Sequence, residues 1–201
     1  MGRIMTLRGN WDVQFGVASS FGGIGGRLIF EYESSDRTRA WRVKRAFVNI
    51  QEATGTGGGD TRGLLQCALL TDQISSDQSK ITDEATANRY QRCLGPSDNR
   101  SIAWSTTDMI LRDNVSADWI APHGNANPSW IEMICDADRI VTNELYILSY
   151  GLTESGNHLW TASYYIEMEE VKLTPSESLF AQLKGTGQEV SRGAFVGFPE
   201  S

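Results

Sequence analysis

The last third of the chain constrains the fold most, because it holds two long strand-like segments joined by one short break. Residues 139–150 (RIVTNELYILSY) are rich in β-branched and aromatic residues, a composition typical of strands. Residues 151–157 (GLTESGN) interrupt this pattern, and residues 158–174 resume it. A closing hairpin of this length predicts an all-β sandwich and argues against a nucleotide-binding α/β fold.

The rest of the chain is also predicted to be strand-rich, with expected elements at 27–33, 41–50, 63–70, 101–111 and 130–135. The apolar run at 63–70 (GLLQCALL) predicts a strand or helix that is buried on both faces. A single sandwich domain can account for all 201 residues. We therefore expect three parts: a flexible arm over 1–26, a β-sandwich over 27–174, and a C-terminal helix and tail over 175–201.

One helix is predicted, and it begins near the end of the chain. Thr174-Pro-Ser-Glu177 has the form of a capping box with proline at the first helical position. Leu179, Phe180 and Leu183 follow as an apolar stripe. These three residues are candidates for a subunit interface.

Six tryptophans are many for a chain of this size. Three lie in apolar strands and are predicted core residues: Trp41, Trp130 and Trp160. Trp11 and Trp119 flank loops and are candidate subunit-interface residues. An alternative function, a carbohydrate-binding β-sandwich module, would use Trp11, Trp104 or Trp119 to stack sugar rings.

The segment from residue 37 to residue 45 (RTRAWRVKR) is the one concentrated basic stretch. Its five cations are Arg37, Arg39, Arg42, Lys44 and Arg45. On a strand, Arg42 and Lys44 would project from the face opposite Trp41 and Val43. Two interpretations stay open: the cations contact nucleic-acid phosphates, or they form a solvated face that pairs with acids of a neighbouring strand or subunit.

The sequence offers little to a catalytic or metal-binding interpretation. Its two histidines, His123 and His158, are far apart, and no C-x-x-C pair occurs. The three cysteines are predicted to be reduced and mostly buried. We expect no enzyme activity, no cofactor, no metal and no small-molecule substrate. A net charge of −7 also disfavours non-specific binding of nucleic acid by the whole surface.

Residues 139–184, ending in the tyrosine-rich and acidic segment 164–184, resemble jelly-roll capsid proteins of small icosahedral viruses. The likeness is greatest to capsid proteins inferred for small DNA viruses from environmental samples. The resemblance implies a single jelly-roll sandwich of two antiparallel sheets, a homo-oligomeric capsid lattice, location in the virion and no catalysis.

One departure from that family concerns the genome. Such capsid proteins usually carry a basic N-terminal arm, whereas residues 1–26 contain only Arg3 and Arg8 as cations. Three explanations stay open: genome contact through the basic segment 37–45, a shell that encloses a membrane, or genome packing by other proteins.

Overall fold

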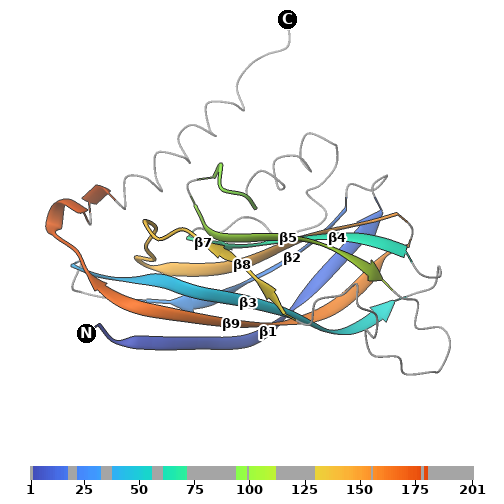
Figure 1. The fold of residues 1–201 in the computed structure, drawn as a ribbon, viewed down its shortest axis with the longest axis horizontal. Helices are drawn as coiled ribbons and strands as arrows, with labels where there is room; N and C mark the ends of the chain where they lie inside the picture. The colour runs from blue at the N-terminus through green and yellow to red at the C-terminus, as the bar shows by residue number, and fades with distance from the viewer. Residues whose placement is uncertain are drawn as a thin grey trace, which may run out of the picture.

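A computed structural model describes residues 2–17, 22–32, 38–55, 61–71, 94–98, 100–111, 130–154, 156–177 and 179–180. The described elements are almost entirely strands (Figure 1). In chain order they are β1 (Ile4–Val17), β2 (Gly23–Glu31), β3 (Arg39–Gly55), β4 (Thr61–Leu70), β5 (Ser101–Leu111), β6 (Ile131–Glu132), β7 (Ile134–Cys135), β8 (Glu144–Thr153) and β9 (His158–Lys172).

The strands pair as a nest. β1 pairs with β9, β2 with β8, β3 with β6, and β4 with β5, all antiparallel. β9 also pairs with β3, and β8 also pairs with β4. The result is a first sheet in the order β6-β3-β9-β1 and a second sheet in the order β2-β8-β4-β5. This nesting is a jelly roll, and it confirms the predicted all-β sandwich of two antiparallel sheets.

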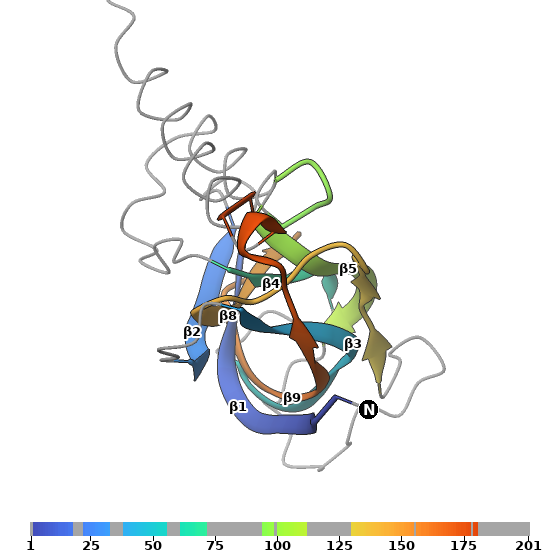
Figure 2. The same cartoon turned by 90° about the vertical axis from the view of Figure 1, so that its left-hand side faces the viewer.

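Two places along the chain connect the sheets to each other. The end of β1 runs past the start of β9. Phe15 lies opposite both His158 of β9 and Gly151 of β8, and Gly16 and Val17 continue in parallel with β8. On the other side β6 pairs with β3 and β7 pairs with β5, with only Met133 between them. Strands that switch sheets form the corners of a sandwich. The end view in Figure 2 shows the two sheets joined in this way around a common interior.

The main core lies between the two sheets. It takes Trp11, Val13 and Phe15 from β1, and further side chains from β3, β4, β5, β8 and β9. Along β9, Ile166 and Met168 are buried in this core while the alternate residues face outward. Trp41 and Trp160 are core residues, as predicted.

The second sheet is buried on its outer face as well. A separate apolar cluster lies there, made of Ile24, Ala68, Leu70, Leu94, Leu148 and Tyr150. The turn that contributes Leu94 also contains a buried ion pair, in which Arg100 Nη2 lies 3.0 Å from Asp98 Oδ2. The predicted element at 63–70 is therefore a strand, β4, and its burial on both faces is confirmed.

The expected flexible arm over residues 1–26 is wrong for the described residues. Residues 4–17 are β1, paired with β9 along most of their length, and β2 begins at Gly23. The glycines at the start of β2 have a packing role. A Cβ on Gly25 would overlap the carbonyl oxygen of Asp12, and one on Gly23 would lie 2.6 Å from that of Gln14. Glycine therefore lets β2 approach β1 closely.

The predicted capping box is present at the end of β9. The Thr174 backbone N–H donates to Glu177 Oε2 at 2.7 Å, and the Glu177 N–H donates to Thr174 Oγ1 at 3.3 Å. The hydrogen bond from the Thr174 backbone lowers the pKa of the Glu177 carboxyl. The helical turn that follows includes Leu179 and Phe180, and both side chains are exposed.

Candidate functional surfaces

The basic segment lies on the first sheet, where β3 runs beside β9. Arg42 Nη1 lies 3.6 Å from Glu169 Oε1, and Lys44 Nζ lies 3.5 Å from the same oxygen. Arg39 Nη1 is 3.0 Å from Glu170 Oε1. These contacts follow from the antiparallel register, which places Arg42 directly opposite Glu169.

The ion pairs show that three of the five cations have acidic neighbours on the adjacent strand. The predicted outward projection of Arg42 and Lys44, with Trp41 buried, is confirmed. Arg45 is exposed and lies opposite Glu167 in the register, and Arg37 lies outside the described residues. The pairing fits the solvated-face interpretation, while a nucleic-acid role for these cations stays a prediction.

The same outer face carries a row of aromatic side chains that crosses the strands. The rings of Phe47 on β3 and Tyr165 on β9 have centroids 6.3 Å apart, and Trp130 meets Phe47 edge-on at 6.5 Å. At the other end, the guanidinium carbon of Arg8 on β1 lies 5.1 Å from the Tyr165 ring centroid. We call these four residues the aromatic row.

Trp130 is the member of this row whose predicted position in the core is wrong. It was predicted to be a core residue, but 51% of its surface is exposed. The alternation in Trp130-Ile-Glu-Met-Ile134 contains the signal that was missed. Ile131 and Met133 share the buried face, so Trp130 lies on the same outward face as the exposed Glu132.

The proposed interface residues fall into three groups. Trp11 is only 4% exposed, and its indole N–H donates to Ser149 Oγ at 3.1 Å. Because Trp11 is buried in the core, it cannot contact a partner or a sugar ring. It lies inside strand β1 and does not flank a loop. Leu179 and Phe180 are exposed by 58% and 67%. Trp119 and Leu183 lie outside the described residues.

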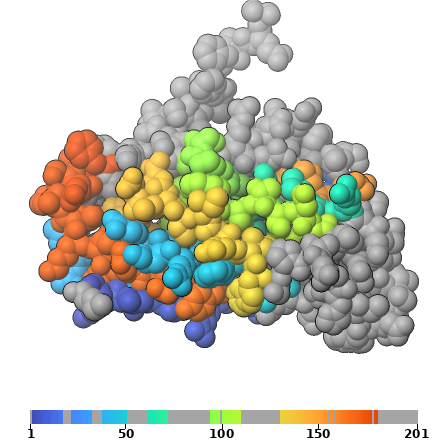
Figure 3. Space-filling model, in the orientation of Figure 1, coloured from blue at the N-terminus to red at the C-terminus, as the bar shows by residue number. Residues whose placement is uncertain are grey.

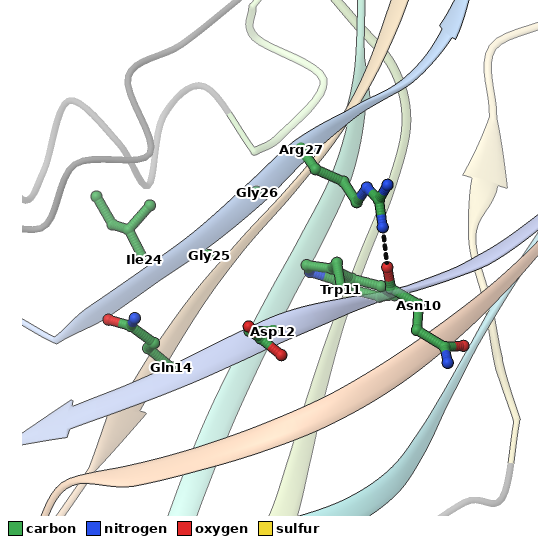
Figure 4. Close-up of a pocket in the computed structure, with 8 residues that line it drawn as sticks. All are labelled: Asn10, Trp11, Asp12, Gln14, Ile24, Gly25, Gly26 and Arg27. Atoms are coloured by element: carbon green, nitrogen blue, oxygen red, sulfur yellow. Dashed lines mark hydrogen bonds between the residues drawn. The ribbon is translucent and has the colours of Figure 1, made fainter.

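A polar cleft lies between β1 and β2, the edge strands of the two sheets, and Figure 4 shows its lining. The N–H of Glu170 donates to the carbonyl of Arg3. The backbone N–H and C=O groups of the odd-numbered residues at this end of β1 therefore point toward β9, and those of the even-numbered residues point toward the cleft. Arg27 Nη1 donates to one such carbonyl, that of Asn10, at 2.7 Å. A charged side chain that covers an edge in this way hinders the addition of another strand.

The described thiols are not activated nucleophiles. Burial raises the pKa of the Cys67 thiol to about 12 and that of the partly buried Cys135 thiol to about 11. Both thiols therefore stay protonated at neutral pH. Cys67 and Cys135 are free, as predicted, while Cys93 lies outside the described residues.

No protein-family model matches the chain, and no curated protein sequence matches it. Among solved structures, it is similar to apo chimpanzee polyomavirus VP1, with a TM-score of 0.39, 6% identity, and coverage of 85% of this chain and 96% of that one. It is also similar to the T=3 Penaeus vannamei nodavirus, with a TM-score of 0.36, 10% identity, and coverage of 86% and 55%.

A third similar structure is the decameric BFDV capsid protein, with a TM-score of 0.28, 15% identity, and coverage of 84% of this chain and 100% of that one. At TM-scores below 0.5 such likenesses are loose. We therefore base the functional proposal on the chain's own strand pairing and surfaces.

Two kinds of site are absent from the part of the chain that the structure describes. No group of three or more histidine, cysteine, aspartate or glutamate side chains is placed to hold a metal ion. Within the same residues, no helix has the length and apolar character needed to cross a membrane.

Proposed function

We propose that this chain is a capsid protein that associates with copies of itself into the icosahedral shell of a small virus. The observation that carries the proposal is the nested pairing of β1 with β9, β2 with β8, β3 with β6, and β4 with β5. Jelly rolls of this kind serve as viral capsid domains, lectin domains and cupins. Since fold alone does not decide between them, the residues must.

The residues argue against a cupin and against the lectin site that the sequence suggested. Cupins hold a metal with clustered histidines, whereas this chain has only two, separated by 35 positions (158 − 123). The lectin site that the sequence suggested would stack sugar rings on Trp11, Trp104 or Trp119. Of these, Trp104 is partly buried against the second core and Trp119 lies outside the described residues. Trp11, the first candidate for that role, is a buried core residue with its N–H already bonded.

Two further features favour a shell protein. The sequence resemblance to capsid proteins covers residues 139–184, which include β8 and β9, the strands at the centre of the two sheets. The first sheet also leaves aromatic side chains on its solvent face, which is typical of surfaces that contact another protein.

Genome contact through the first sheet would be weak under this proposal. Arg39, Arg42 and Lys44 are paired with glutamates, so few cations remain to release counterions from a phosphate backbone. We expect the logarithm of any binding constant for single-stranded DNA to fall with log salt with a slope of roughly −1 to −2. A slope steeper than about −4 would mean that the genome is held by this protein through a larger basic surface.

Size-exclusion chromatography with light scattering, followed by electron microscopy of the largest species, tests the proposal. Closed particles, or the pentamers and trimers from which such particles are built, would support it. A monomer at every salt concentration and pH would overturn it. A variant that ends at residue 184 sharpens the test, because we expect it to fold normally and to assemble poorly if the tail links neighbouring copies.

A further inference from the structure

The aromatic row on the first sheet has the composition of a contact surface. Its four members come from β1, β9, β3 and the residue before β6, so the row crosses the whole width of the sheet. Trp130 is half-exposed, and Arg8 lies over the face of Tyr165. Tryptophan, tyrosine and arginine are the residues that most often dominate the binding energy of protein interfaces.

The position of the row adds to this argument. Figure 3 shows the side of the molecule on which residues of β6 and β7, in yellow, lie between those of β3 and β5. Here the chain passes from one sheet to the other, and Trp130, Glu132 and Ile134 all face outward. Ile134 is 64% exposed. Exposed apolar side chains that gather in this way mark a binding surface more often than chance exposure does.

The charges around the row decide which partner it suits. Glu132 lies opposite Phe47 in the register, and Glu167 lies opposite Arg45. With Arg8, these residues give two cations and two anions beside the rings. A phosphate backbone would meet repulsion as often as attraction there, whereas a second protein surface with both signs can pair with it. A two-fold contact between identical copies brings such a mixed-sign surface against itself.

We infer that the aromatic row, with Trp130 at its exposed end, is the centre of a contact between two copies of this chain. The inference rests on the proposed self-association and adds to it the surface that makes the contact. The three rings and the Arg8 guanidinium that lies over Tyr165 would be covered by the partner copy, and Arg45, Glu132 and Glu167 would form the polar rim around them.

The test uses the full-length chain and a Trp130→Ala variant. Light scattering over a range of protein concentrations would measure the dissociation constant of the first oligomer. Loss of a tryptophan that the contact buries should raise that constant by about 30-fold or more. Thermal unfolding of the variant at a concentration where both proteins are monomeric should be nearly unchanged, because Trp130 is half-exposed.

Leu159→Ala is the matched control. Leu159 is also a large apolar side chain of the first sheet, 41% exposed, but it lies near the start of β9, away from Tyr165 of the aromatic row. This variant should associate as the wild-type chain does. If both variants weaken association equally, general loss of apolar surface explains the effect and the assignment to the row fails.

The remaining outcomes separate the inference from the proposed function. Normal association of Trp130→Ala would overturn the inference and leave self-assembly intact, whereas a wild-type chain that never associates would overturn both. Titration with a fluorescent oligothymidine tests whether the aromatic row binds single-stranded nucleic acid instead. Tight binding that Trp130→Ala abolishes would assign the row to single-stranded nucleic acid and end the copy-to-copy interpretation.

Discussion

The two sheets of this protein have the same number of main strands but different surroundings. The first sheet has one buried face and one face open to solvent, so β9 alternates between buried residues such as Ile166 and partly exposed residues such as Glu167. The second sheet is buried on both faces around β8, where every residue from Ile147 to Gly151 is buried. The first sheet can therefore offer a surface to a partner, and the second stabilises the domain itself.

This difference predicts which substitutions lower the free energy of unfolding and which alter association between copies. Changes at the outer face of the second sheet should lower the free energy of unfolding, because that face is a second core. Changes at the outer face of the first sheet should alter association and leave the fold nearly intact. Four experiments, in order of falling expected effect, test the division.

The largest loss is expected from Asp98→Ala, in the turn at the start of β5. Arg100 Nε donates to Asp98 Oδ1 at 3.1 Å and Arg100 Nη2 to Asp98 Oδ2 at 3.0 Å, and both residues are buried. Removal of the carboxylate breaks a buried two-point ion pair with the guanidinium, which should cost about 3–5 kcal/mol in a urea titration. Asp136→Ala, which removes the more exposed pair with Arg139, is the control and should cost about 1 kcal/mol or less.

Leu148→Ala tests whether the outer face of the second sheet is a true core. Leu148 and its neighbour Ile147 point to opposite faces of β8, and both are almost fully buried. Each alanine variant should lose about 2–5 kcal/mol of unfolding free energy. A loss below about 0.5 kcal/mol for Leu148→Ala, beside a large loss for Ile147→Ala, would mean that this face is open to water as the first sheet's is.

Gly25→Ala tests the close contact between the edge strands of the two sheets. The added methyl group would overlap the carbonyl oxygen of Asp12, so β1 and β2 would have to move apart, at a cost of about 1–3 kcal/mol. Gly95→Ala has open space around the new methyl group and should change stability by less than about 0.5 kcal/mol. Equal effects at the two positions would contradict this account of the contact.

The smallest effect is expected from Glu169→Gln on the outer face of the first sheet. Its pairs with Arg42 and Lys44 are partly exposed, so their loss should cost about 1 kcal/mol or less at low salt and less still at high salt. Urea titrations at two salt concentrations measure this. A loss above about 2 kcal/mol that salt does not reduce would show that the first sheet depends on these charges for folding.

The sequence predicted the parts of the fold in which a local pattern and the tertiary environment agree. The alternation in β3 identified Trp41 and Val43 as its buried face, and the continuous apolar run in β4 identified burial on both sides. The capping box at Thr174 predicted the one described helical turn. In these segments the order of apolar and polar residues along the chain is enough to predict which side chains are buried.

Other parts could not be predicted because their cause is tertiary. The glycines at the start of β2 resemble a loop, and only the nearby Asp12 carbonyl shows why a side chain is excluded there. Trp11 resembles a loop-flanking residue until β1 is paired with β9. The aromatic row is assembled from Arg8, Phe47, Trp130 and Tyr165, which only the register of the strands brings together.

The nested strand order also affects how the protein folds during its synthesis. Ile4 pairs with Glu169, so its partner is added 165 residues later (169 − 4). At 5–20 residues per second, a ribosome takes roughly ten to thirty seconds to make that stretch. Throughout that time the N-terminal end of β1 lacks the strand with which it pairs. Folding can be completed only late in synthesis, and contacts so distant along the chain favour slow folding. In a cell that makes this protein in quantity, every nascent chain therefore carries an incompletely paired first strand until β9 has been synthesised.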